Sequence, residues 1–134
     1  MLTYAEALDV HQIAVPDHLV AQAEVPVLAG TQRQGDLLIR PTTMPATTPV
    51  PRSGVQLVVG EETGNTHWLD GPGVCFDRRD GGRADPLLGV VTVPDGRVGY
   101  VTHTDEHGAN AVAPGSYEIR RARVQATEVM LVAD

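Results

Sequence analysis

Glycine and proline interrupt this chain so often that long helices are excluded. Its 134 residues include 14 glycines and 10 prolines, which divide it into short segments. Such frequent interruption argues against a helical bundle. Apolar residues make up 42% of the chain but aromatic residues only 4%. We therefore expect a core of Val, Leu, Ile and Ala side chains between thin sheets.

Short apolar segments bounded by turn residues predict about eight β-strands. The clearest predicted hairpin joins residues 87–93 to 97–102 through a Pro-Asp-Gly turn, and another joins 66–69 to 73–76. The other expected strands lie at residues 37–39, 55–59, 117–119 and 129–132. Residues 41–51 contain four prolines and four threonines, which predicts an extended loop. The pattern indicates a mainly β fold, either a small antiparallel sandwich or an open barrel.

The first 30 residues differ from the rest and predict a short helical arm. Tyr4, Ala5 and Leu8 share one face of a helix, and a second short helix is expected after Pro16-Asp17. We therefore divide the chain into an arm at 1–30 and a β domain at 31–134. Because the apolar face of the arm needs cover, we expect a homo-oligomer or a protein partner bound through it.

The net charge and the single cysteine indicate which binding partners and which cellular compartment to expect. The net charge of −7 argues against nucleic acid as a partner. The one basic run, Arg120, Arg121 and Arg123, is expected to lie on a solvated strand edge. Cys75 stands alone between apolar residues, so we expect no disulfide and a packing role. The N-terminal residues resemble neither a signal peptide nor a membrane span, which predicts a cytoplasmic protein without membrane contact.

Two segments, residues 60–67 and 103–108, concentrate the side chains that carry chemistry. They hold three of the five histidines and four carboxylates, and Trp68 follows the first segment. If the segments meet, His67, His103 and His107 are candidate ligands for a divalent metal such as zinc. Glu106 is then the candidate general acid or base. The alternative is a plain turn, with His67 packed beside Trp68 and the carboxylates solvated.

Three sequence blocks resemble a family of small, functionally uncharacterised bacterial and bacteriophage proteins. The blocks are Gln34-Gly35-Asp36-Leu37-Leu38, Gly60-Glu61-Glu62-Thr63-Gly64 with His67, and His103-x-x-Glu106-His107-Gly108 followed by Pro114-Gly115-x-Tyr117-x-Ile119. The resemblance spans residues 33 to 124 and implies a β domain with a polar histidine cluster, but no particular activity. This chain departs from the family pattern at Asn65, where the family has a histidine, and at residues 122–124. These departures favour a member that kept the scaffold and lost a reaction.

Two functions follow from these observations, and neither requires a cofactor other than a divalent metal. The first hypothesis is a non-enzymatic domain that acts through protein–protein contacts. The alternative is a metal-dependent hydrolase using His67, His103, His107 and Glu106. A cupin is disfavoured because no second histidine lies two positions from His67. Nucleic-acid binding through the arginines near residue 120 is the weakest option.

Overall fold

A computed structural model describes residues 1–13, 23–58, 66–79, 86–103, 108–121, 123–124 and 130–131. The elements in these ranges are α1 (Tyr4–Asp9), β1 (Val27–Leu28), β2 (Gln32–Gln34), β3 (Leu37–Pro41), β4 (Val55–Gln56), β5 (His67–Asp70), β6 (Cys75–Arg78), β7 (Leu87–Val93), β8 (Gly99–His103), β9 (Ala109–Val112), β10 (Gly115–Arg121), β11 (Arg123–Val124) and β12 (Met130–Leu131). The predicted short helix and most of the predicted strands are therefore present.

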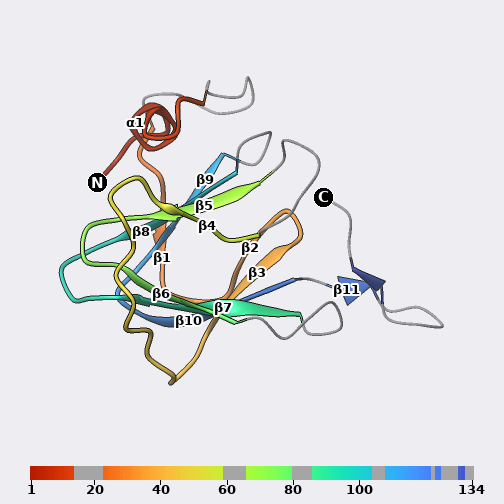
Figure 1. Cartoon of the computed structure of the whole chain (residues 1–134). Helices are drawn as coiled ribbons and strands as arrows, with labels where there is room; N and C mark the ends of the chain where they lie inside the picture. Colours follow the sequence, from red (N-terminus) through yellow and green to blue (C-terminus); the bar gives the residue numbers. More distant parts are fainter. Residues whose placement is uncertain are drawn as a thin grey trace.

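Two five-stranded sheets form the two layers seen in Figure 1. The strand orders are β1-β9-β8-β5-β4 and β2-β3-β10-β7-β6, and β11 pairs with β12 separately. The sheets do not close into a barrel, so the mainly β prediction is confirmed in its sandwich form. Every described pairing is antiparallel except that of β1 with β9, which is parallel.

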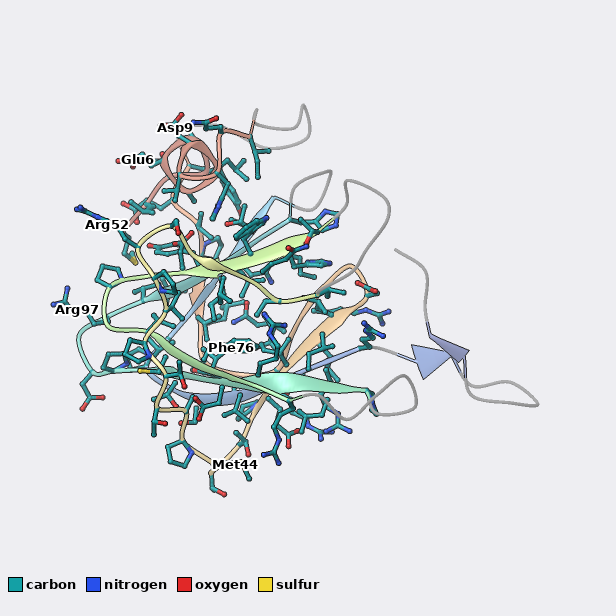
Figure 2. All side chains as sticks on the ribbon, viewed as in Figure 1. Glu6, Asp9, Met44, Arg52, Phe76 and Arg97 are labelled. Carbon is teal, nitrogen blue, oxygen red and sulfur yellow. The ribbon has the colours of Figure 1, made fainter. Side chains whose placement is uncertain are left out.

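The main core lies between the two sheets. Leu69 and Val101 come from one sheet, and Ile39, Phe76 and Ile119 come from the other. Figure 2 shows Phe76 near the centre of the molecule, between the layers. Branched aliphatic residues supply most of the core, as the low aromatic content predicts.

Both predicted hairpins are wrong, although both turns exist. β5 pairs with β4 and β8, whereas β6 pairs with β7, so the Asp70–Gly73 turn carries the chain from one sheet to the other. The Pro94–Gly96 turn does the same between β7 and β8. Turn residues specify a chain reversal but not the pairing partner. β8 is buried along its whole length, so its sequence carries no alternation that would identify its neighbours.

The prediction that the arginine run lies at a sheet edge is also wrong. β10, which ends with Arg120 and Arg121, is the central strand of its sheet, between β3 and β7. Arg120 is half-buried, and its Nη1 lies 3.3 Å from the Glu118 carboxylate. Arg121, the last residue of β10, is likewise half-buried.

The N-terminal segment packs on the sheet that contains β8 and β9. Thr3 caps α1 in a capping box with Glu6, with contacts of 3.0 and 3.2 Å. Ala7 and Leu8 are buried, and α1 contacts β8 and β9. β1 lies before residue 30 and yet pairs with β9, so packing continues across the predicted domain boundary. Most of the second predicted helix lies at residues 14–22, outside the described residues.

No helix among the described residues is long and apolar enough to cross a lipid bilayer.

Candidate functional site

His67 and His103 lie side by side inside the molecule. They are register partners where β5 begins and β8 ends, because the two strands are antiparallel. Their ring centroids are 4.3 Å apart with an interplanar angle of 46°, and each residue is only 1% exposed. The predicted convergence of these two histidines is confirmed, whereas their role as metal ligands stays a prediction.

Two further predicted site residues, Glu106 and His107, lie outside the described residues. The same holds for Glu61 and Glu62, which were expected near the histidines. Within the described ranges, no three His, Cys, Asp or Glu side chains are arranged as they stand to hold a metal ion.

Gln34 connects His67 to the opposite sheet. Its Nε2 donates to the Val101 carbonyl at 2.8 Å and to Asn110 Oδ1 at 2.9 Å. Its Oε1 lies 2.9 Å from His67 Nδ1. Because Gln34 belongs to β2 and the other groups belong to the opposite sheet, this buried amide crosses between the layers.

Asp36 approaches the other nitrogen of His67. Its Oδ1 lies 3.3 Å from His67 Nε2, and its side chain is 16% exposed. Burial by itself raises the pKa of Asp36. The hydrogen bond and charge of His67, helped by a backbone N–H and by Arg121, more than offset burial and hold this pKa below its usual value. Asp36 is therefore a carboxylate at neutral pH.

Sequence reasoning did not assign Gln34, Asp36 or Asn110 to the site. The available signal was Gln34-Gly35-Asp36, which was noted only as part of a resemblance. Gly35 has φ of 57°, in the left-handed region that favours glycine, and makes the reversal between β2 and β3. This turn brings the two polar side chains that flank Gly35 against the same imidazole.

A family model described as Domain of unknown function (DUF8820) matches residues 33–122. This chain belongs to that family. The expectation of an uncharacterised family is confirmed, while the bacterial or phage origin and the motif assignments stay predictions. The DUF8820 region begins within β2 and ends just after β10, so it includes the histidine pair, Gln34 and Asp36. No curated protein and no solved structure matches the chain.

An open groove lies at the other end of β5. Its walls include Met1, Leu2 and Val10 from the N-terminal segment, and the turns at residues 70–73 and 96–98. Met1 is 74% exposed and Val10 is 50% exposed. Arg52 and Arg97 also line the groove, and Figure 2 shows both on the left side of the view.

Hydrogen bonds fix the walls of this groove. The Leu2 N–H donates to the Tyr100 hydroxyl at 3.1 Å, which attaches the N-terminus to β8. His11 Nε2 lies 2.6 Å from Asp70 Oδ2, and the His11 ring lies beside Trp68 with centroids 5.6 Å apart. These contacts hold the segment that follows α1 against β5.

Proposed function

We propose that this domain is a non-enzymatic association module that binds an extended protein segment in the groove beside α1. The observation that carries this proposal is the exposure of Met1 and Val10 within a groove whose walls are fixed. Apolar side chains gathered in an open concave surface are typical of sites that another molecule covers. His67 and His103, by contrast, are closed off from solvent.

The charge of the groove indicates what the partner segment carries. Arg52 and Arg97 are both exposed, and neither has an ion-pair partner in the part of the chain that the structure describes. Two such arginines beside one groove contrast with a net charge of −7 for the whole chain. A partner segment with a carboxylate next to an apolar side chain complements this surface.

Selection from a random peptide display library tests this function. We expect the wild-type chain to enrich peptides that combine acidic and apolar residues. In fluorescence anisotropy, the Val10→Asp variant should bind them much more weakly, because it places a charge against the apolar wall. Reversing Arg52 or Arg97 to Glu should weaken binding roughly fivefold, the upper range for an exposed ion pair.

Arg79→Glu is the matched control, because Arg79 is exposed, carries the same charge and is not among the lining residues of the groove. Failure to enrich any peptide, or equal binding by the Val10 and Arg79 variants, contradicts the proposal. Light scattering over a range of protein concentrations tests the other occupant, a second copy of the chain. An increase in mass that Val10→Asp abolishes identifies the association as self-association.

A metal-dependent hydrolase is the second candidate, supported by the contact between His67 and His103. In this candidate His107 completes the ligands, and Glu106 moves protons on a bound water. Elemental analysis and zinc-dependent hydrolysis of chromogenic phosphate and acetate esters test it. The Glu106→Gln variant should lose activity while it keeps its metal; activity that does not depend on zinc rejects this candidate.

We also propose that the protein is located in the cytoplasm of a bacterial or phage-infected cell. It rests on the single cysteine, Cys75, which gives no internal disulfide, and on the motif resemblance.

A further inference from the structure

Three arginines gather on the outer face of the sheet that contains β10. Arg33 of β2 and Arg120 of β10 are both register partners of Leu38, one on each side of β3. Arg40 lies on the same face as Leu38, because Ile39 between them is fully buried and successive side chains of a strand alternate. We call Arg33, Arg40 and Arg120 the arginine cluster. It surrounds one half-buried leucine.

The arginine cluster is only partly neutralised by the described residues. Glu118, the register partner of Arg40, is the carboxylate that pairs with it. The Oε2 atom of Glu118 accepts a hydrogen bond from Arg40 Nη2 at 2.8 Å and another from Arg120 Nη1 at 3.3 Å. Arg33 has no ion pair with any described residue. Three positive charges against one negative charge leave a positive excess on this face, although the net charge of the chain is −7.

The chemistry of the cluster favours carboxylates as its ligands. Arg33 and Arg40 are exposed, and the Arg40 side chain is 49% exposed. All ten basic residues of the chain are arginines rather than lysines. A guanidinium group binds a carboxylate through two parallel hydrogen bonds, whereas the ammonium group of a lysine acts as a point charge. Phe76 and Tyr117, the aromatic residues in the strands of this sheet, lie in the core, so these strands offer no outward ring for stacking a nucleic-acid base.

The solvent side of α1 carries the complementary charge. Glu6 and Asp9 are both exposed and lie three positions apart, which places them on the same side of the helix. Figure 2 shows both at the edge of the molecule beside α1. No basic residue lies in the last turn of α1 to neutralise them. This side of the helix therefore presents two carboxylates to another molecule.

α1 and the arginine cluster lie on opposite sides of the molecule. α1 contacts β8 and β9 from outside, where Ala7 packs with Tyr100. The cluster is on the outer face of the other sheet, so both sheets lie between the two surfaces (Figure 1). A chain therefore cannot join its own two surfaces, whereas two copies can. Such a contact is heterologous, and it leaves one free surface of each kind at the two ends.

We propose that the protein self-associates head to tail, with the arginine cluster of one copy bound to Glu6 and Asp9 of the next. Further copies add in the same way, because each added copy presents the same two surfaces again. The ion pairs are exposed, so each contributes little, and the association is weak and sensitive to salt. None of these residues lines the groove beside α1, so the contact needs no ligand there.

Light scattering at a series of protein concentrations tests this association. We expect the average mass to rise with concentration at about 0.1 M salt. The rise should disappear at about 1 M salt, because the screening length falls from about 10 Å to about 3 Å. The cluster variant Arg33→Glu/Arg40→Glu and the helix variant Glu6→Arg/Asp9→Arg each place like charges at the contact. Each should weaken the association roughly fivefold or more.

A mixture of the two double variants gives the sharper result. The reversed cluster of one variant then faces the reversed helix of the other, so opposite charges meet again. We expect the mixture to associate, although neither variant does so alone. Thermal unfolding of each variant is measured first, because Glu6→Arg also removes the contact of Glu6 with the Thr3 N–H. Recovery in the mixture cannot come from unfolded chains, and a mixture of folded variants that stays monomeric overturns the proposal.

Arg52→Glu is the matched control, because Arg52 is exposed, carries the same charge and lines the groove instead. Its association should equal that of the wild type, and loss in this variant but not in the cluster variant places the contact in the groove and overturns the proposal. A wild-type chain that stays monomeric at low salt overturns it too. So does a mass that stops at a dimer, because surfaces on opposite sides cannot close a pair. Binding of a single-stranded oligonucleotide by the cluster without any increase in mass assigns this face to nucleic acid instead.

Discussion

The side-chain amide of Gln34 joins the two sheets inside the molecule. It is 2% exposed, donates to Val101 and Asn110, and accepts from His67. A buried amide of this kind is stabilising only while all its partners are present, because each partner is also shielded from water. The polar interior is therefore sensitive to single substitutions.

Gln34→Leu is expected to destabilise the fold by about 1 to 3 kcal/mol, since it removes the acceptor that faces the buried Nδ1 of His67. The Val101 carbonyl and Asn110 Oδ1 each lose the hydrogen bond that Gln34 Nε2 donates to them. Urea denaturation measures the change. Gln56→Leu is the control, because Gln56 is only half-buried and its Nε2 bonds Thr66. Equal losses for both variants would contradict a special role for Gln34.

At the scale of elements, the proline- and threonine-rich loop is attached along β6. The Phe76 N–H donates to the Thr48 carbonyl at 2.8 Å. The Thr48 and Thr47 N–H groups donate to the two Asp77 oxygens at 2.9 and 3.1 Å. Hydrogen bonds from Thr48 are the largest influence on Asp77, and together with those from Thr47 they lower its pKa. The predicted extended loop is thus confirmed, with β6 as its support.

Asp77→Asn should lower the thermal midpoint at pH 7, because the amide presents a donor to one of these N–H groups. The folded pKa of Asp77 lies below its unfolded value of 3.8. Its stabilising contribution is therefore complete above that value and is lost as the pH falls through the folded pKa. The difference between wild type and variant should shrink below about pH 4. Asp95→Asn, in an exposed turn, is the control.

β6 and β7 meet closely at Gly89. A Cβ added there would lie 2.5 Å from the Phe76 ring and 2.7 Å from the Asp77 carbonyl oxygen. Gly89→Ala should therefore cost about 1 to 3 kcal/mol through overpacking. Gly30→Ala is the matched control, because a Cβ there meets nothing within 4 Å. Chemical denaturation that finds both alanine variants equally stable would contradict this account.

At the scale of the whole molecule, the N-terminal segment shares a core with the sheet. Ala7 and Val25 pack with Tyr100, Ala109 and Ala111 in a cluster separate from the main core. This packing covers the helix face that was expected to need a partner. The apolar surface that the segment leaves for another molecule is the groove beside the helix, with Val10 in its wall.

Leu8→Ala tests whether this segment folds as one unit with the sheets. Leu8 is 0% exposed, and a buried Leu→Ala change costs about 2 to 4 kcal/mol. We expect one cooperative unfolding transition at lower denaturant concentration. An independent arm would instead leave the main transition unchanged, which would support the division at residue 30. Val10→Ala, on the exposed side, is the control and should have little effect.

The sequence by itself determined local features of this protein. The spacing of glycine and proline limits the strands to short lengths. The capping box of Thr3 and Glu6 defines where α1 begins. Alternation along β10 identifies Tyr117 and Ile119 as its buried face. These features follow from neighbouring residues, because capping, turn formation and alternation act over a few positions.

The tertiary structure alone decided which strands pair and which side chains meet. Two Gly-containing turns predicted hairpins, but burial on both faces of β8 sends the chain between sheets instead. Asp36, in the turn between β2 and β3, reaches His67 of β5 only because the two sheets face each other. Contacts of this kind depend on how distant apolar faces cover each other, which no local pattern encodes.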